Sequence, residues 1–304
     1  MLHFAEVEKP TPRENEVLIK IRAASVNPLD RFTMRGAPLV RLIPSLRTPR
    51  DQRIGVDAAG QVESVGRNVT QFKPGDEVFG VCRGAFAEYA CATEDKLAVK
   101  PANISFEDAA AVPVAAISAL QGLRDKGRIK QGQRVLVDGA SGGVGTFAVQ
   151  IAKSFGAEVT AVCSTRNVDT ARSIGADHVI DYTKGDFTKS GLRYDLILGA
   201  NAHHSIFDYR RALSQVGIYV VVGGGLPRIF QAVLLAPLLS RVGSKKTSFF
   251  IASINQKDLV FVKELLEAGK VVPVIDRRYP LSATAEAVSY LEEGHARGKI
   301  VLIV

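Results

Sequence analysis

The sequence predicts an α/β protein that combines a β-rich lobe with a doubly wound parallel sheet. Three observations predict it. The first hundred residues are short alternating or β-branched runs divided by Gly, Pro and Asn; residues 134–225 alternate apolar strands with helical patterns; and a glycine-rich turn joins the first strand and helix of that alternation. With 304 residues, 46% of them hydrophobic, the chain is long enough for two lobes with ordinary globular cores.

In the first lobe we expect strands in four runs: EVLIKIRAASV (16–26), GVDAAGQVESVG (55–66), DEVFGV (76–81) and FAEYACAT (86–93). A helix is expected over 106–127, because this segment is rich in Ala, Ser105 and Asp108 are N-terminal cap signals, and Gly127 stands near its end.

The second lobe follows as strict strand–helix alternation. The segments are RVLVDGA (134–140), GTFAVQIAKSFG (145–156), EVTAVCS (158–164), VDTARSIG (168–175), HVIDY (178–182), YDLILGA (194–200), a helix around SIFDYRRALSQ (205–215) and IYVVVGGG (218–225). The tail is again mixed, with helices in 256–269 and 284–294 and strands in 273–281 and 299–304, and we expect it to return to the first lobe. The predicted domains are therefore 1–112 with 256–304, and 113–255.

The glycine turn is a candidate dinucleotide site. Ala140, Gly142 and Gly145 occupy the three positions of G-x-G-x-x-G between a strand and a helix, and Ser141, Gly143 and Val144 complete the loop. Gly142 would let the backbone approach a pyrophosphate, Gly145 would let the helix pack on the strand, and the helix N-terminus would attract the anion. A tight turn without a ligand is the competing interpretation.

The end of the next strand distinguishes the cofactors. An NAD enzyme usually places Asp or Glu there, on the ribose 2′-hydroxyl, whereas this chain has Ser164, Thr165 and Arg166. Hydroxyls and a guanidinium suit a 2′-phosphate, and one charge-assisted hydrogen bond contributes roughly 1.5–3 kcal/mol. The residues therefore favour NADPH, with a solvated surface arginine as the alternative for Arg166.

With these motifs placed, the chain resembles zinc-independent members of the medium-chain dehydrogenase/reductase superfamily, in the quinone oxidoreductase branch. The matching segments span nearly the whole chain in the family's order: ASVNPLD (24–30), GVDAAGQVESVG, FKPGDEVFG (72–80), GAFAEYA (84–90), the Ala-rich segment 109–120, DGASGGVG (138–145), IGADHVIDY (174–182) and GHARGKIVL (294–302).

The resemblance implies a GroES-like catalytic domain built from both ends of the chain and a Rossmann NADPH-binding domain between them. It implies NADPH reduction of quinones or of the C=C bond of α,β-unsaturated carbonyls, by enzymes that often form homodimers. By matching motif, Asn27 and Ser118 would lie near the nicotinamide, Tyr182 near the adenosine 2′-phosphate and Lys299 at the phosphates. Gly223 would lie at the edge of the nicotinamide.

No metal is expected. Zinc-dependent relatives have an early cysteine and a G-H-E, where this chain has VNPLD and GVDAAG, and neither its five histidines nor its three cysteines (Cys82, Cys91 and Cys163) make a plausible ligand set. The odd cysteine number also argues against a disulfide framework and favours a reducing, cytoplasmic location. No signal peptide and no apolar run of about 20 residues is evident. The net charge of +8 suits an anionic ligand, but the basic residues are dispersed, so we expect no nucleic-acid partner.

Conjugate reduction asks less of a metal-free protein than alcohol oxidation does, because it needs only a hydride, donors to a developing oxyanion, and a proton. Asn27 is the candidate oxyanion donor, with a turn-fixing Asn before Pro28 as the alternative. Asp30 is a proton relay or, more simply, a turn cap. His203 and His204 follow the fourth strand of the sheet and are expected to be exposed loop residues outside the core site, although either one could donate a proton.

The apolar segment 226–243 is a separate feature. It would be a lid over a lipophilic acceptor, an interfacial membrane contact, or packing between lobes or subunits. The alternatives to the quinone or enone reductase are an NADPH-binding regulatory protein with little catalysis, a zinc-free alcohol dehydrogenase, and an enoyl-thioester reductase.

Overall fold

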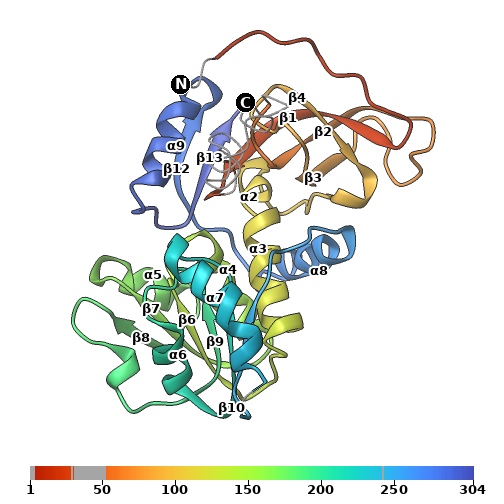
Figure 1. The fold of residues 1–304 in the computed structure, drawn as a ribbon. Helices are drawn as coiled ribbons and strands as arrows, with labels where there is room; N and C mark the ends of the chain where they lie inside the picture. The colour runs from red at the N-terminus through yellow and green to blue at the C-terminus, as the bar shows by residue number, and fades with distance from the viewer. Residues whose placement is uncertain (1–3, 29, 31–52, 242) are drawn as a thin grey trace, which may run out of the picture. The chain divides into compact units, whose positions relative to one another are not determined.

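A computed structural model describes residues 4–28, 30, 53–241 and 243–304. The chain divides into two compact units, one formed by residues 1–114, 254–267 and 273–304, the other by 115–253 and 268–272. The first unit thus uses both ends of the chain, as the ribbon coloured from red to blue shows (Figure 1).

The first unit is built on a mixed sheet. Its strand order is β12-β13-β1-β2-β3-β5, with β4 paired to β1, and the bounds are β1 Glu16–Val26, β2 Asp57–Val65, β3 Glu77–Val81, β4 Tyr89–Thr93, β5 Leu97–Val99, β12 Ile275–Pro280 and β13 Lys299–Ile303. Residues Val17, Ile19 and Ile21 of β1 lie in its apolar core. The last strand, β13, pairs antiparallel with β1. Strands from the two ends of the chain are therefore neighbours in this sheet.

Helices of the first unit are α2 (Phe106–Ala110), α8 (Gln256–Glu267) and α9 (Thr284–Glu292), with short 3₁₀ turns at Glu94–Lys96 and Leu281–Ala283. The expected helix over 106–127 is divided. A capping box of Ser105 and Asp108 starts α2, and a new helix, α3 (Pro113–Gln121), begins at Pro113, where a missing N–H is tolerated. The chain continues as a π-helical turn at Gly122–Lys126.

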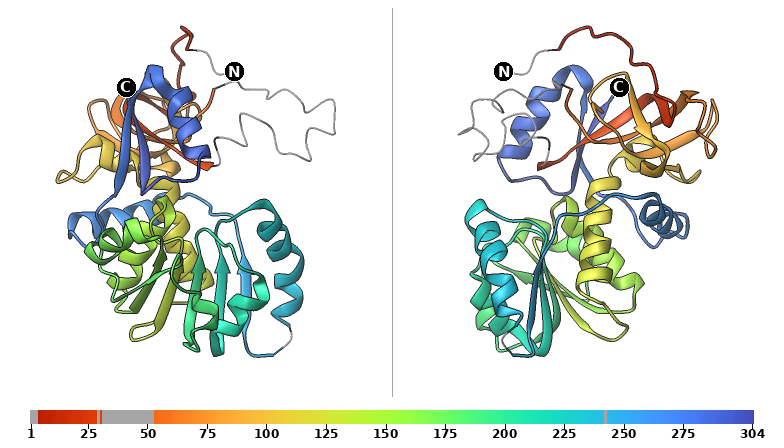
Figure 2. Two further views of the ribbon diagram at one scale, coloured as in Figure 1. Left: turned by 90° about the vertical axis from the view of Figure 1, so that its left-hand side faces the viewer. Right: turned by 45° about the vertical axis from the view of Figure 1, so that its right-hand side comes forward.

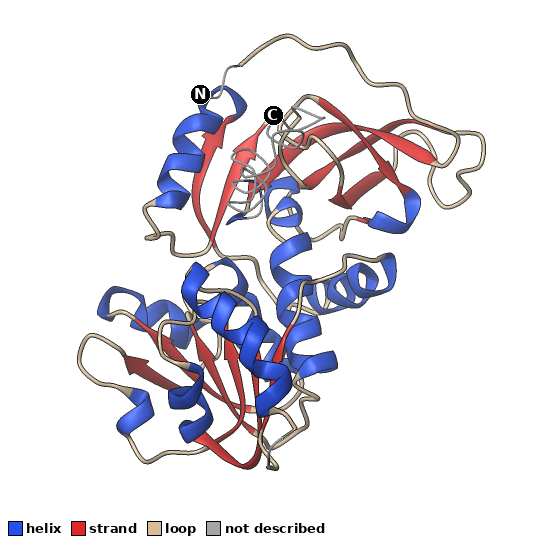
Figure 3. Ribbon diagram, viewed as in Figure 1, coloured by secondary structure: helices blue, strands red, loops and turns tan. Residues whose placement is uncertain are grey.

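The second unit contains six parallel strands among its described residues, in the order β11-β10-β9-β6-β7-β8. Their bounds are β6 Arg134–Asp138, β7 Glu158–Cys163, β8 His178–Asp181, β9 Tyr194–Gly199, β10 Leu213–Val221 and β11 Lys246–Phe249. The helices are α4 Gly143–Ser154, α5 Val168–Ser173, α6 Ile206–Ala212 and α7 Leu226–Leu239, with 3₁₀ turns at Thr165–Asn167 and Phe187–Lys189. Helices lie on both faces of the sheet (Figures 2 and 3). The predicted α/β class with a doubly wound parallel sheet is confirmed.

The direction of winding reverses between β6 and β9. From β6 the chain adds β7 and β8 on one side, and then adds β9, β10 and β11 on the other. Sheets of this kind bind ligands in the crevice at the carboxyl ends of the strands, at such a reversal. The glycine turn after β6 and the loop after β9 flank this position.

Residues 226–239 of the apolar segment form α7, which continues through Pro237 to Leu239. Ala232 and Ala236 are buried, whereas one face exposes larger apolar side chains, those of Leu226, Phe230, Val233, Leu234 and Leu238. No helix in the described ranges has the length and apolar character needed to cross a membrane.

Candidate cofactor and active site

Two glycines of the turn are at positions where the surrounding backbone leaves no room for a side chain. A Cβ on Gly145 would lie 2.0 Å from the carbonyl oxygen of Gly139, and one on Gly139, whose φ is +81°, would lie 2.6 Å from the Cβ of Asn201. In contrast, a Cβ on Gly142 would meet only the Gly139 oxygen, at 3.6 Å. Gly145 and Gly139 are thus required by packing, while Gly142 leaves open space at the start of α4.

Gly142 is the N-cap of α4 and offers no capping side chain to the first-turn N–H groups. The loop beside it is partly exposed at Ser141, Gly143 and Val144 and buried at Ala140. A twelve-residue helix presenting its positive end at an open glycine is suited to an anionic pyrophosphate.

Asn167 connects this turn to the end of β7. Its buried side-chain Nδ2 donates to Ser141 Oγ at 3.0 Å and to Ser164 Oγ at 3.1 Å. Because each serine oxygen accepts a hydrogen bond from the amide, each hydroxyl keeps its own proton to donate to an anion. Asn167 could not be predicted from the sequence, because nothing about an asparagine after a strand indicates that it hydrogen-bonds serines 26 and 3 residues away.

The contact of Thr165, a predicted cofactor residue, with Asp181 is the second feature that the sequence did not reveal. Its hydroxyl donates to Asp181 Oδ2 at 2.5 Å, and Oγ1 lies 3.0 Å from that of Thr183. The hydrogen bond from Thr165 lowers the pKa of Asp181, so this carboxylate is ionised beside the proposed 2′-phosphate position. The parallel pairing of β7 with β8 places Cys163 opposite Asp181 and so brings Thr165 to this carboxylate; no motif in the sequence signals that contact.

The remaining predicted cofactor residues of the second unit fall into two groups. Tyr182 follows β8 with 59% of its surface exposed, and Gly223 follows β10, where a Cβ would come within 2.5 Å of the Ala200 oxygen. These two therefore lie at the carboxyl ends of the strands together with 140–145 and 164–166. Ser118 is instead buried within α3.

Asn27 and Lys299 meet in the first unit, 272 residues apart in sequence. Lys299 Nζ donates to Asn27 Oδ1 at 2.6 Å and lies 3.3 Å from Asp57 Oδ2. Asn27 Nδ2 donates to the same carboxylate oxygen at 2.9 Å, as does Ser25 Oγ. Both ends of the Asn27 amide and the Lys299 ammonium are thus engaged with protein groups, and the roles expected of them at the nicotinamide and the phosphates stay predictions.

Asp30 lies beside this cluster. Its Oδ2 accepts the N–H of Asn27 at 2.7 Å, which is the contact of a turn cap, while its Oδ1 is buried and has no hydrogen-bond partner among the residues that the structure describes. Burial raises the pKa of this carboxyl to about 7, against the opposing effect of the Asn27 hydrogen bond.

The residues around Asp57 do not suit a zinc ion. Asp57 Oδ2 is surrounded by a hydroxyl, an amide and an ammonium, and its Oδ1 accepts the N–H of Val114 at 3.0 Å. Lone pairs that accept hydrogen bonds are not available to a metal, and an ammonium repels one. Across the described part of the chain, no three His, Cys, Asp or Glu side chains are placed to hold a metal ion.

The fold and the glycine turn define a class, the two-domain oxidoreductases with a nicotinamide-dinucleotide domain. Comparison with known families agrees: the model of the alcohol dehydrogenase GroES-like domain matches residues 13–102, and the model described as zinc-binding dehydrogenase matches 174–302.

Curated relatives identify the branch. The chain is 34% identical to the chloroplast envelope quinone oxidoreductase homolog of Arabidopsis thaliana, over 99% of this chain and 93% of the relative. It is 34% identical to the mitochondrial NAD(P)H oxidoreductase RTN4IP1 of Bos taurus (95% and 82%) and 36% identical to the 2-methylene-furan-3-one reductase of Solanum lycopersicum (98% and 74%). The solved quinone oxidoreductase of Coxiella burnetii superposes with a TM-score of 0.84 at 29% identity, covering 98% of this chain and 93% of that one.

The chain therefore belongs to the medium-chain dehydrogenase/reductase superfamily, in its quinone oxidoreductase branch. As a member of this branch it is an oxidoreductase with a nicotinamide cofactor. The predicted GroES-like and Rossmann folds are confirmed.

Proposed function

We propose that the protein is an NADPH-dependent, metal-independent reductase of quinones or α,β-unsaturated carbonyls. One observation carries the cofactor preference: Asn167 Nδ2 donates both to Ser141 Oγ, beside the N-terminus of α4, and to Ser164 Oγ, beside Arg166, so both hydroxyls keep a proton to donate. Two hydroxyl donors, one next to a helix N-terminus and one next to an arginine, suit a ligand with a pyrophosphate and a 2′-phosphate.

Among the described residues of this site, Asp181 is the one that would disfavour NADPH. An ionised carboxylate next to Thr165 repels a 2′-phosphate and would accept a hydrogen bond from a 2′-hydroxyl. We propose that Arg166, with Ser164 and Thr165, outweighs this repulsion. Tyr182 would border the adenosine and Gly223 the nicotinamide.

The acceptor class is supported by the chemistry and by the relatives. When bound, the nicotinamide supplies a hydride to an electron-poor carbon or oxygen. The protein's residues then need to hold the acceptor, stabilise the negative charge on its oxygen and supply a proton. Two of the relatives named above are a quinone oxidoreductase homolog and a reductase of a methylene furanone. Asn27 and Ser118 are the proposed residues at the nicotinamide side, and Lys299 the proposed residue at the phosphates.

The test is a scan of NADPH and NADH oxidation at 340 nm with a quinone, a short enal, a simple enone and a plain aldehyde, each with and without a chelator. We expect NADPH to be oxidised with the quinone or an enone, unaffected by the chelator. Faster turnover with NADH, or loss of turnover in the chelator, would refute the proposed cofactor or the metal-independent chemistry.

Tight NADPH binding without turnover of any acceptor would instead indicate the regulatory NADPH-binding protein. Preferred turnover of the plain aldehyde, or of an enoyl thioester added to the scan, would indicate the other two alternatives. The homodimer, the peripheral membrane contact through 226–243, the absence of a nucleic-acid partner and the cytoplasmic location stay predictions.

A further inference from the structure

The loop after β9 lies at the reversal of the sheet and is tied to the glycine turn. Asp138, the last residue of β6, is paired with Gly199, the last residue of β9, and its carbonyl oxygen accepts the N–H groups of Ala200 and Asn201 at 2.9 and 3.2 Å. The loop that continues to His203 therefore borders the crevice where a doubly wound sheet binds its ligand.

Two side chains hold the backbone of His203 from opposite sides. Its N–H donates to Tyr209 Oη at 3.1 Å, and its carbonyl oxygen accepts from Arg228 Nε at 3.0 Å. Tyr209 comes from α6 and Arg228 from α7, so two separate helices fix one loop residue.

Tyr209 is itself held firmly. It is fully buried, its ring stacks on Tyr219 with centroids 4.3 Å apart, and its hydroxyl donates to Asp138 Oδ2. Burial raises the pKa of the Asp138 carboxyl, while the tyrosine hydrogen bond and the two nearby histidines lower it. A buried carboxylate next to the glycine turn thus orients the hydroxyl that positions His203.

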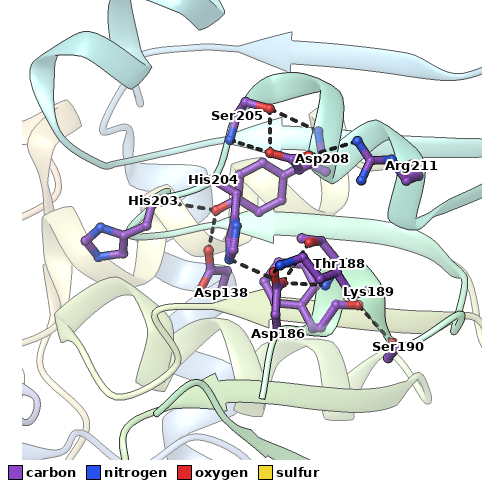
Figure 4. Close-up of polar contacts among 12 residues, drawn as sticks. Asp138, Asp186, Thr188, Lys189, Ser190, His203, His204, Ser205, Asp208 and Arg211 are labelled. Atoms are coloured by element: carbon purple, nitrogen blue, oxygen red, sulfur yellow. Dashed lines mark hydrogen bonds and ion pairs between the residues drawn. The ribbon is translucent and has the colours of Figure 1, made fainter. Parts of the chain in front are cut away.

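The two adjacent histidines differ sharply. The His204 ring packs edge-on against Phe187 and Tyr209, at 5.1 and 5.8 Å between centroids, and its Nε2 lies 3.8 Å from Asp186 Oδ1. The His203 side chain is exposed, and Figure 4 shows its ring pointing away from Asp138 and His204. His203 therefore has a backbone held by two hydrogen bonds and an imidazole that is accessible to a bound ligand.

We propose that His203 supplies the proton in the reaction, and that Tyr209, Asp138 and Arg228 are positioning residues for it. This inference rests on the proposed function. The acceptor gains a hydride, so two electrons move onto its oxygen as an enolate or hydroquinolate. An N–H bond of the His203 imidazolium then breaks as the O–H bond of the hydroquinone forms, or that of the enol, which tautomerises in solvent to the saturated carbonyl. The neutral imidazole regains its proton from solvent. Imidazole is the side chain suited to this exchange near neutral pH.

Titratable or charged groups reach the loop of His203 from β6, from the loop itself and from α7. Asp138 belongs to β6, His204 to the same loop, and Arg228 to α7. Asp186 and Asp208 face His204, and Arg211 pairs with Asp208 at 3.0 Å.

The first arm of the test does not need turnover. The ¹³Cε1 resonance of His203, assigned by loss in His203→Gln, should move when NADPH is added. His178 is an internal control, because it begins β8 at the opposite, amino-terminal edge and its Nε2 lies 2.8 Å from Glu158 Oε1. A His203 resonance that is unchanged under saturating NADPH would overturn the inference, whatever the enzyme's activity.

The second arm measures kinetics with the acceptor that turns over fastest. His203→Gln should lower kcat about 10²-fold, at the low end for a lost general acid because water can also give a proton. It should also abolish the loss of rate with rising pH that we expect of the wild type. Its Kd for NADPH should change less than about threefold. Wild-type kcat and pH dependence in His203→Gln would overturn the inference even if quinone or enone reduction is established.

Two further variants separate positioning from catalysis. Tyr209→Phe keeps the stacked ring and loses the hydroxyl, so kcat should fall about tenfold while the pH-dependent limb remains. The matched control His204→Gln should keep kcat within about threefold. If the wild type reduces no acceptor, the proposed function fails and the proton-donor role with it. A responsive His203 resonance would then show only that this residue borders the cofactor.

Discussion

Replacing Lys299 by Met should destabilise the first unit strongly. Lys299 is buried and shares its ammonium between Asn27 Oδ1 and Asp57 Oδ2. Met keeps most of the stem's apolar volume and removes the charge. Asp57, which is completely buried, would retain Ser25, Asn27 and the Val114 N–H as donors but lose its only ion-pair partner among the described residues.

The magnitude follows from the burial of both partners. Removing one member of a buried ion pair typically costs about 3–5 kcal/mol, because the remaining charge is left uncompensated in a poorly polarisable interior. An exposed pair contributes only about 0.3–0.5 kcal/mol. The structure offers that comparison within the same unit, since Lys263 and Glu267 form an i,i+4 pair on α8 at 2.6 Å with both side chains in contact with water. Lys263→Met should therefore change the free energy of unfolding by less than about 0.5 kcal/mol.

Urea denaturation followed by circular dichroism measures both variants, and a double-mutant cycle tests the cause. In an Asp57→Asn background, Lys299→Met should cost at least about 1 kcal/mol less than in the wild type, because no buried carboxylate is left unpaired. Equal costs in the two backgrounds, within about 0.5 kcal/mol, would refute the electrostatic reasoning and leave only lost packing.

Four other substitutions test single residues. Asp30→Asn should make the protein more stable than the wild type, increasingly so as pH rises. The folded-state pKa of Asp30, about 7, lies above the ordinary 3.8, so the wild type loses stability between about pH 4 and 7, by at most roughly 4 kcal/mol. Melting temperatures of both proteins at pH 5 and 8 measure the difference. Gly145→Ala should lower the melting temperature because its Cβ meets backbone at 2.0 Å, whereas Gly142→Ala should fold normally and weaken NADPH in a fluorescence titration. Arg166→Ala should raise the Kd for NADPH about 10- to 100-fold and that for NADH little, and equal losses would mean that the phosphate site lies elsewhere.

Much of the fold follows from local pattern. The alternation of apolar runs with helical segments predicts β6 to β9 and α4 to α6 within a few residues, because hydrophobic periodicity and glycine turns act locally. It does not predict that β10 begins at Leu213, inside the helix expected over 205–215, nor the strand β11 at Lys246–Phe249. The split of the expected helix at Pro113 also has a local cause, the missing N–H of proline. These features need no knowledge of distant contacts.

The contacts that define the site depend on partners far apart in sequence. The approach of Lys299 to Asn27 requires β13 to pair with β1, and the sequence alone leaves the target of the ammonium undetermined. The positioning of His203 by Tyr209 and Arg228 likewise requires two helices to meet one loop. Neither arrangement leaves a motif that a scan along the chain would detect.

Charge at the cofactor site is better judged locally than from the whole chain. The net charge of +8 favours an anionic ligand in general, yet β7 and β8 bring Arg166 and an ionised Asp181 to neighbouring strand ends. Thr165 donates to that carboxylate, which leaves Thr165 a weaker donor to a phosphate than its sequence position implies. The proposed preference for NADPH therefore depends mainly on Arg166 and on the hydroxyls of Ser141 and Ser164, whose oxygens accept from Asn167 and whose protons are left to donate.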